Sequence, residues 1–333
     1  QAPTEVRLQD GTSLRIDTFR LKTDKTSGET DYVESRDRLV AGLTAVFDGK
    51  MRSDLLNRLM LKPGLGWEDV DLLRAYVRYS MQIGPFFATS VVERVLFHNA
   101  ALTEALVEYF HARFHPRFGA ADGDERKTRT ENARRAIVDG LRAIQDASED
   151  RVFRVLLNLI DATVRTNAFR TDRKFHYISF KIDCAKLDKC PEPRPLHEIS
   201  VYHAEMEGCH LRGGKVARGG IRWSDRPDDF RTEIFGLMRT QQVKNVLIVP
   251  VGAKGGFVVR GVPKAGQDRK AYGDAMYEVL IRGMLDVTDN RVEGKEVWPA
   301  GVVCHDAFDP YLVVAADKGT AHLSDTANRL SAE

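Results

Sequence analysis

The sequence has few cysteines and no long apolar run. Only four cysteines occur in 333 residues, and no two form a C-x-x-C pair. A low count is typical of a reducing compartment, so we expect a cytoplasmic protein. No apolar run approaches the roughly 20 residues that cross a membrane, and the N-terminus lacks the apolar core of a signal peptide. We therefore expect neither a membrane protein nor a disulfide-stapled secreted scaffold.

An excess of charge of one sign is also missing. Lys and Arg total 50, and Asp and Glu total 48. This balance gives no basic footprint for nucleic acid. Hydrophobic residues at 43% and charged residues at 29% are ordinary for a globular chain. The chain begins at Gln1 without an initiator Met and ends abruptly at Glu333, which suggests a fragment of a longer protein.

The first half of the chain has helical periodicity. Residues 1–31 alternate weakly and predict strands or loop. From residue 32, apolar residues recur at helical spacing, and Gly and Pro punctuate the pattern. We expect a helical region of antiparallel pairs over 32–170, and predict helical stretches at 32–60, 67–83, 89–114, 128–145 and 149–165.

The period changes near residue 171. Strand-like segments then alternate with helical ones, which predicts an α/β fold with a mixed sheet over 171–333. Strands are expected at 175–182, 198–206, 215–223, 246–250, 256–260 and 311–316. Helices are expected at 225–244 and 265–285, and a further helix begins at 320.

Cations and glycine pairs concentrate between residues 213 and 260. Arg218 directly precedes Gly219-Gly220, Lys254 directly precedes Gly255-Gly256, and Lys244 ends the helix between them. Glycine pairs let the backbone approach a ligand and expose N–H donors. Lysine and arginine bind carboxylates, so this layout could hold a small dicarboxylate. Crowding by other cations lowers the pKa of a lysine, which would suit it to act as a base.

Each of these cations also has an ordinary structural explanation. A Lys-Gly-Gly sequence is commonly a surface turn. Lys244 at a helix C-terminus is a favourable partner of the helix dipole. Arg218 could simply pair with Asp225 or Asp228. Their shared order and spacing nevertheless favour a common site.

This stretch resembles the active site of glutamate dehydrogenases. That family carries K-G-G-[LI]-R, then a helix with a glutamine three places before a terminal lysine, then P-x-G-[GA]-A-K-G-G. The corresponding segments here are Arg218-Gly219-Gly220-Ile221-Arg222, then Gln241-Gln242-Val243-Lys244, then Pro250 to Gly256. The resemblance implies that Lys254 is the catalytic lysine and that Gln241 and Lys244 hold the substrate α-carboxylate. Arg218, with Gly219, stands where the small hexameric enzymes have a lysine at the distal carboxylate.

A second family element lies downstream. The family's A-G-D-x-G segment, whose Asp transfers protons, is matched by Ala315-Ala316-Asp317-Lys318-Gly319. The resemblance thus implies that Asp317 is catalytic, whereas local sequence equally allows it to cap a helix opening at Thr320. The sequence of residues 212–330 resembles the large bacterial NAD-dependent subtype. This resemblance implies NAD as the cofactor, and glutamate, 2-oxoglutarate and ammonium as the reactants. It also implies a role in amino-acid catabolism and a homo-oligomer.

A G-x-G-x-x-G turn is absent from the whole sequence. In the family, the dinucleotide domain follows the Asp element. We therefore expect the chain to be a substrate-binding catalytic domain of the amino-acid dehydrogenase type, preceded by a helical region, without the Rossmann NAD domain. On this interpretation the chain is inactive alone, and its NAD-binding residues are unknown.

Two other groups of polar residues could suggest a metal site or a catalytic triad. His203, Cys209 and His210 are close in sequence, but their spacing matches no structural zinc site, so we expect no metal. Cys304-His305-Asp306 resembles a nucleophilic triad on paper. Adjacent residues rarely face one another, so we do not expect a triad.

Two alternatives to a glutamate dehydrogenase core stay open. In one, the chain is a regulatory or assembly module, with helices 32–168 making subunit contacts and the Gly-Lys loops binding an amino acid or anion. In the other, the enzyme is a leucine- or phenylalanine-type dehydrogenase. The cation Arg218 favours an acidic side chain over an apolar one.

Overall fold

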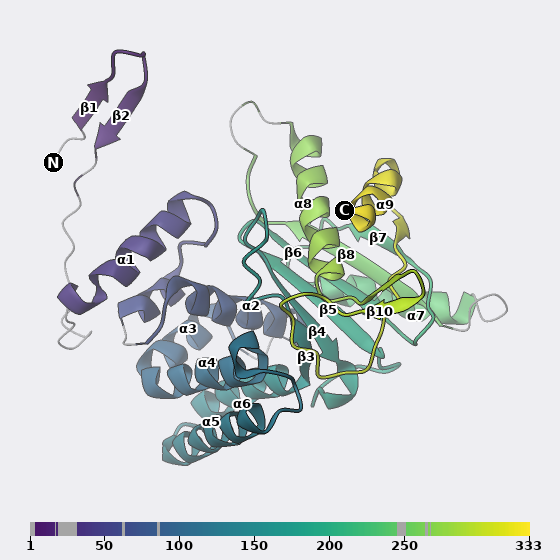
Figure 1. Cartoon of the computed structure of the whole chain (residues 1–333), viewed down its shortest axis with the longest axis horizontal. Helices are drawn as coiled ribbons and strands as arrows, with labels where there is room; N and C mark the ends of the chain where they lie inside the picture. The colour runs from purple at the N-terminus through teal and green to yellow at the C-terminus, as the bar shows by residue number, and fades with distance from the viewer. Residues whose placement is uncertain are drawn as a thin grey trace.

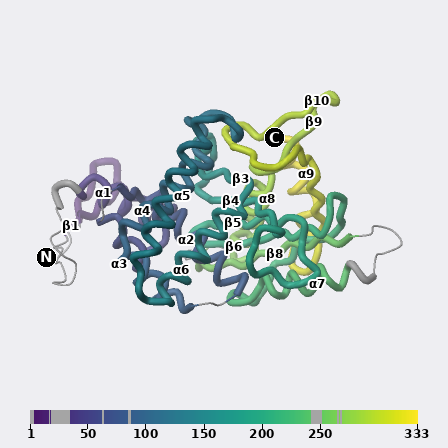
Figure 2. Tube along the Cα trace, turned by 90° about the horizontal axis from the view of Figure 1, so that it is seen from below, coloured from purple at the N-terminus to yellow at the C-terminus, as the bar shows by residue number. Residues whose placement is uncertain are grey.

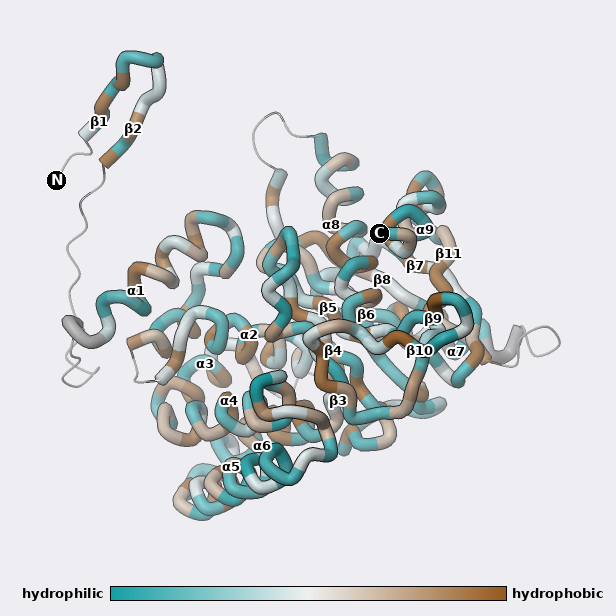
Figure 3. The backbone as a smooth tube through the Cα atoms, viewed as in Figure 1, coloured by the Kyte–Doolittle hydropathy of each residue, from teal (hydrophilic) through white to brown (hydrophobic). Residues whose placement is uncertain are grey.

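The computed structural model describes residues 4–16, 18, 32–61, 64–84, 87–244, 251–263, 266 and 268–333. A helical part and an α/β part lie side by side (Figure 1). A short hairpin precedes them, formed by β1 (Thr4–Arg7) and β2 (Ser13–Ile16). Its hydrophobic and hydrophilic residues alternate (Figure 3), and all of them are exposed. Of the strands or loop expected over 1–31, weak strands are present here, and residues 19–31 lie outside the described residues.

The helical part confirms the expected helical region, but the single stretch predicted over 32–60 is wrong, because the chain turns at Gly49 (φ 72°) and forms two separate helices. Its helices are α1 (Tyr32–Phe47), η2 (Leu55–Leu61), α2 (Trp67–Ile83), α3 (Thr89–His98), α4 (Ala100–Phe114), η3 (Pro116–Phe118), α5 (Asp124–Ala143) and α6 (Ala147–Ala162). They share one hydrophobic core that extends to strand residues such as Phe180 and Ile182. This shared core joins the helical part to the sheet.

The expectation of one helix over 89–114 is wrong, because the helix breaks at Asn99. The Asn99 backbone leaves the helical conformation, with φ −102° and ψ 51°. Its side-chain nitrogen donates to the Val95 carbonyl at 3.0 Å, the same carbonyl that accepts its backbone N–H. Asparagine side chains offer the backbone such alternatives to helical hydrogen bonds, so α3 ends here and α4 begins.

The expectation that a helix continues to Arg165 is also wrong. Helix α6 ends at Ala162, and β3 (Thr163–Thr166) follows at once. The β-branched residues Thr163, Val164 and Thr166 favour a strand, and β3 pairs with β4. The sheet therefore begins before residue 171, where sequence periodicity places the start of the α/β part.

A mixed seven-stranded sheet forms the α/β part, with the order β11-β7-β8-β6-β5-β4-β3. The pairings from β3 through β4, β5 and β6 to β8 are antiparallel. The pairings of β8 with β7 and of β7 with β11 are parallel. The predicted mixed sheet is confirmed. Its remaining strands are β4 (Ile178–Asp183), β5 (His197–His203), β6 (Met206–Arg212), β7 (Gly220–Trp223), β8 (Ala253–Val259) and β11 (Ala315–Ala316).

Several strand bounds differ from expectation. The single strand predicted over 198–206 is a hairpin, because β5 turns at Ala204-Glu205 into β6. Glu205 stabilises this turn by donating its backbone N–H to His203 Nδ1 at 3.0 Å. The buried strand expected over 311–316 shrinks to the two exposed residues of β11, which lie at the sheet edge. The strand expected over 246–250 lies outside the described residues.

Helices cover both faces of the sheet. Helix α8 (Arg269–Leu285) packs on one face, where a Cβ on Gly208 would meet Leu280 at 2.5 Å. Helix α7 (Phe230–Lys244) packs on the other, where a Cβ on Gly256 would meet Ile234 at 2.3 Å. The C-terminal elements η5 (Ala321–Leu323) and α9 (Ser324–Ala332) lie beside α8 (Figure 1). Within the described ranges, no helix is long and apolar enough to cross a membrane.

Candidate functional site

Lys254 and Asp317 meet at the edge of the sheet. The Lys254 amine donates to Asp317 Oδ2 and forms an ion pair with it. Lys254 is in β8 and is 5% exposed, and Asp317 directly follows β11. The two residues are 63 positions apart. Parallel pairing of β11 with β7 and of β7 with β8 brings these two strand ends together.

Gly220 makes room for this contact. Strand β7 lies between β8 and β11, with Ile221 opposite Gly255, so Gly220 aligns with Lys254. A Cβ on Gly220 would lie 3.1 Å from the Asp317 Cβ and 3.1 Å from the Ala316 carbonyl oxygen. Such distances are tighter than ordinary contacts, so only glycine leaves Lys254 a clear path across β7 to Asp317.

Asp317 is held in a fixed turn rather than acting as a helix cap. Its backbone N–H donates to Thr320 Oγ1 at 3.0 Å, and that hydroxyl donates to the Ile221 carbonyl at 2.7 Å. The helical turn η5 has Thr320 as N-cap and no side-chain cap hydrogen bond. The Asp317 carboxylate thus faces Lys254, and the local alternative of a helix cap is wrong.

The electrostatics of the pair favour an ionised Asp317. Burial opposes its charge, but hydrogen bonds from Lys254 and from the Lys318 backbone, with the charges of Lys254 and Arg222, outweigh burial and hold the pKa of Asp317 below its ordinary value. The carboxylate is therefore charged at neutral pH and can accept a proton.

Gln241 and Arg218 are brought to the same edge. With its amide oriented to satisfy both acceptors, Gln241 in α7 donates to the carbonyl oxygens of Ala253 at 2.7 Å and Arg218 at 3.3 Å. Arg218 forms a parallel bridge with Gly252, just before β8. Both amide hydrogens of Gln241 are thus used on backbone that borders Lys254.

The Arg218 side chain is exposed and makes no hydrogen bond or ion pair with another described residue. The expected alternative partner Asp228 approaches Arg260 instead, at 3.9 Å. Lys244 is the last residue of α7, but its side chain lies outside what the structure describes. The structure therefore brings together Lys254, Asp317, Gln241 and the Arg218-Gly219 backbone.

Sequence reasoning missed two charged residues beside this site. Arg222 Nε lies 3.6 Å from Asp317 Oδ2, and Arg222 Nη1 donates to Glu233 Oε1 at 2.9 Å. Arg222 belongs to the motif quoted above, and its position two residues after Gly220 puts it on the same sheet face as the Lys254–Asp317 pair. Nothing in the sequence shows that Glu233 of α7 faces it.

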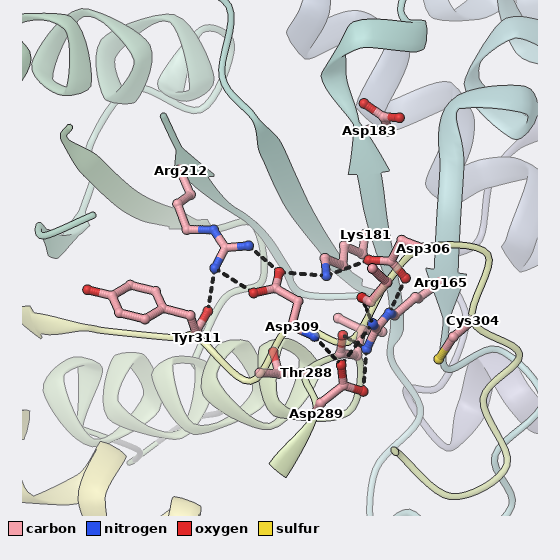
Figure 4. Close-up of polar contacts among 12 residues, drawn as sticks. Arg165, Lys181, Asp183, Arg212, Thr288, Asp289, Cys304, Asp306, Asp309 and Tyr311 are labelled. Carbon is pink, nitrogen blue, oxygen red and sulfur yellow. Dashed lines mark hydrogen bonds and ion pairs between the residues drawn. The ribbon is translucent and has the colours of Figure 1, made fainter. Parts of the chain in front are cut away.

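The segment that leads to Asp317 is anchored by a largely buried charge cluster (Figure 4). We call it the anchor cluster. Its cations come from three strands of the sheet, and its carboxylates come from the segment between α8 and β11. The members are Arg165, Lys181, Arg212, Asp289, Asp306 and Asp309.

The contacts of the anchor cluster are short and mostly sheltered. Arg165 donates to Asp289 at 2.7 and 2.9 Å and to Asp306 at 2.5 Å. Lys181 donates to Asp306 at 2.7 Å and to Asp309 at 2.8 Å. Burial alone would raise the pKa of Asp309, but hydrogen bonds from Arg212 and Lys181 hold it well below its ordinary value.

The cluster fixes a path across the end of the sheet. After β9 (Asn290–Val292) and β10 (Lys295–Val297), the chain passes beside the helical part (Figure 2). Arg212 also donates to the Tyr311 carbonyl at 2.7 Å, and the Tyr311 hydroxyl donates to the Ala217 carbonyl at 2.9 Å. These side-chain contacts, rather than a long strand, hold the segment that places Asp317 at the sheet edge.

Cys304, His305 and Asp306 face different partners. Asp306 binds Arg165 and Lys181, whereas His305 Nε2 donates to the Arg113 carbonyl at 2.9 Å. Burial raises the pKa of Cys304 to about 11. These orientations do not form a nucleophilic triad. Across the described part of the chain, no group of three His, Cys, Asp or Glu residues could hold a metal ion.

Comparison with known proteins places this geometry in an enzyme class. Residues 136–333 match the family model of the bacterial NAD-glutamate dehydrogenase catalytic domain, and residues 51–116 match that of glutamate dehydrogenase helical motif 3. The first match includes every residue of the Lys254–Asp317 site. The chain belongs to the bacterial NAD-glutamate dehydrogenase catalytic-domain family.

Similar proteins are curated as NAD-specific glutamate dehydrogenases. The chain is 44% identical to the one from Pseudomonas aeruginosa, 43% to that from Halomonas elongata and 41% to that from Mycobacterium tuberculosis, over 99%, 100% and 98% of its length. It covers 21%, 20% and 21% of these relatives. The chain thus spans about a fifth of the length of the curated relatives it matches.

Proposed function

We propose that this chain supplies the substrate-binding and catalytic residues for the reversible NAD-dependent oxidative deamination of L-glutamate to 2-oxoglutarate and ammonia. The contact between the Lys254 amine and the Asp317 carboxylate carries the proposal. Family membership and the printed names of the relatives support it. No observation on the described residues favours a purely regulatory module or a different amino acid as substrate.

Lys254 and Asp317 divide the chemistry between a cation and a base. The Lys254 ammonium polarises the keto oxygen of 2-oxoglutarate and, on deprotonation, activates water for attack on the imine carbon. Asp317 is ionised at neutral pH and takes a proton from the substrate nitrogen, then returns it in the reverse direction. Their contact in the free enzyme keeps both groups oriented before substrate arrives.

The two acid ends of the substrate need separate cations. We assign the distal carboxylate to Arg218 with the Gly219 N–H, because the Arg218 side chain is exposed and unpaired with any described residue. We assign the α-carboxylate to Lys244 and Gln241. Gln241 can join only by releasing one of its two carbonyl partners, at Ala253 or Arg218. Its main contribution in the free state is to hold the start of β8.

NAD, when bound, supplies the hydride acceptor for the substrate Cα–H. No residue of this chain is assigned to NAD binding, because the sequence contains no G-x-G-x-x-G turn. What this chain does is bind, orient and exchange protons with the substrate. We also propose a catabolic role in the cytoplasm, supported by four free cysteines, and a homo-oligomer, which sedimentation of the intact enzyme would test.

Substitution of Lys254 tests the proposed function. In the intact enzyme, Lys254→Ala should lower kcat for glutamate by about 1,000-fold or more, because it removes both the cation and the proton relay. Lys318→Ala is the matched control: this exposed lysine is one residue from Asp317 and should keep near-normal turnover. A regulatory role predicts instead a normal rate with an altered response to effectors. Normal turnover by Lys254→Ala would defeat the proposal.

Substrate choice is tested at Arg218. Arg218→Ala should raise KM for glutamate by about 10-fold or more and should change turnover of leucine little, since leucine has no distal carboxylate to bind. An unchanged KM for glutamate would remove Arg218 from the substrate site.

A further inference from the structure

Arg222 lies between two carboxylates beside the catalytic pair. Its Nη1 donates to Glu233 Oε1 at 2.9 Å, and its Nε lies 3.6 Å from Asp317 Oδ2. The side chain is 21% exposed and projects from β7, next to the Lys254 strand. Gly256 lies opposite Arg222 in the sheet, and Ile234 of α7 packs against it.

One donor of Arg222 is unsatisfied. The Nε atom is buried and has no hydrogen-bond partner among the described residues. A distance of 3.6 Å to Asp317 exceeds the usual 2.7–3.2 Å of an N–H···O hydrogen bond. Buried donors without partners are rare in proteins and call for an explanation. Asp317 Oδ2, the carboxylate oxygen 3.6 Å from this Nε, is already paired with Lys254.

The far end of Arg222 is firmly fixed. Glu233, in the first turn of α7, also accepts a hydrogen bond from the Ser224 hydroxyl at 2.6 Å. Glu233 therefore has both oxygens in use, one on Arg222 and one on Ser224. Two cations and two carboxylates alternate in the order Lys254, Asp317, Arg222, Glu233. The guanidinium is thus held in place while its Nε points toward Asp317.

Resting on the proposed function, we propose that Arg222 is a positioning residue that holds Asp317 when the Lys254 amine leaves it to engage the substrate. In the free state, Lys254 and Arg222 share one carboxylate oxygen, and Lys254 is closer. When Lys254 turns to the substrate carbonyl, the Nε–Oδ2 gap closes to a hydrogen bond. Asp317 then stays fixed and ionised while it exchanges a proton with the substrate nitrogen.

A simpler role for Arg222 is to tie β7 to α7 through Glu233. That role predicts effects on stability alone. The positioning role predicts an effect on the pKa of Asp317 as well. The charged groups that face this carboxylate from the described elements are Lys254 of β8 and Arg222 of β7, with Glu233 of α7 behind Arg222. Loss of the Arg222 charge raises the pKa of Asp317, so the acidic limb of kcat/KM moves to higher pH.

The experiment measures pH profiles of the intact enzyme with Arg222→Gln and Arg222→Lys. We expect Arg222→Gln to lower kcat by about 10- to 100-fold, to change KM for glutamate less than about 3-fold and to move the acidic limb upward by at least half a pH unit. Arg222→Lys keeps the charge but loses the directed Nε donor, so we expect a smaller pH shift with a reduced kcat. Arg226→Gln is the matched control, since this exposed arginine pairs only with Asp229 among the described residues.

The outcomes separate this proposal from the proposed function. If Arg222→Gln keeps a wild-type kcat and acidic limb while Lys254→Ala is inactive, Arg222 has no positioning role and the proposed function stands. If Arg222→Gln does not fold, Arg222→Lys decides: an unchanged kcat in that variant overturns the proposal. Full turnover by Lys254→Ala overturns both.

Discussion

A side chain at Gly219 would collide with the backbone of Ala253. An ideal Cβ built on Gly219 lies 1.5 Å from the Ala253 carbonyl oxygen and 2.4 Å from its carbonyl carbon. Both contacts are with backbone, so no side-chain rotation relieves them. Because Ala253 directly precedes Lys254, the glycine sets how closely β8 approaches the segment that carries Arg218.

We expect Gly219→Ala to lower kcat more than a glycine-to-alanine substitution at a position where the added Cβ meets no neighbouring atom. The start of β8 must move by about an ångström, and a misplacement of that size costs about 100-fold in rate. Gly236→Ala is the matched control, because a Cβ there meets nothing within 4 Å and α7 gains helix propensity. Steady-state kinetics of the two variants in the intact enzyme make the comparison. Equal kcat values would show that the close approach at Gly219 is unimportant.

The anchor cluster should be costly to break. Lys181 is 2% exposed and joins Asp306 to Asp309, so Lys181→Met leaves two partly buried carboxylates short of a partner. We expect a loss of about 3 kcal/mol in the free energy of unfolding, measured by urea denaturation. Lys50→Met makes the same chemical change in a half-exposed pair with Asp48 and should cost less than about 1 kcal/mol. A similar cost for the two variants would contradict the structure.

Stability should fall with pH below about 6.5, partly through His210. This β6 residue is 3% exposed, and burial lowers its pKa to about 4. In the unfolded chain, His210 has an ordinary histidine pKa near 6.5. Between about pH 6.5 and pH 4, the unfolded chain therefore binds a proton at His210 that the folded chain does not bind. Stability therefore drops as pH falls from about 6.5 to about 4, by roughly 1.4 kcal/mol per pH unit for this one residue.

His210→Asn removes that contribution. Urea unfolding at a series of pH values should show that the free energy of unfolding falls less steeply with decreasing pH in the variant over this range. Above about pH 7.5, the two proteins should have the same slope. The variant also loses packing, which shifts the whole curve but not its slope. An unchanged slope would mean that the His210 ring protonates freely in the folded chain.

The sequence predicted the parts of the site that share a motif. Spacing of the cations and glycine pairs identified Gly219 and Lys254, and the resemblance to glutamate dehydrogenases added Gln241 and Asp317. Their roles remain proposals, but the structure brings them to one sheet edge. Periodicity also predicted the bounds of α2 and the mixed sheet. These predictions succeed because local backbone preferences and short spacings carry the information.

Partners that lie far apart in the chain could not be predicted. Arg165 and Asp306 are 141 positions apart, and the periodicity of α6 ran on through Arg165. The apolar run at 311–316 predicted a longer, buried strand, whereas β11 is only two residues long. It is placed by pairing with β7 and by the anchor cluster upstream. Arg222 was visible in a motif, but its neighbours Glu233 and Ser224 were not.

The sequence by itself determined which residue types are available for chemistry and which segments form helices or strands, because these depend on neighbours within a few positions. Only the tertiary structure decided that Lys254 meets Asp317 across Gly220, since that contact depends on two parallel strand pairings. It also decided that Arg222 lies beside Asp317 with an Nε donor that has no hydrogen-bond partner among the described residues. Contacts of this kind arise from packing over long separations in the chain, and no local pattern encodes them.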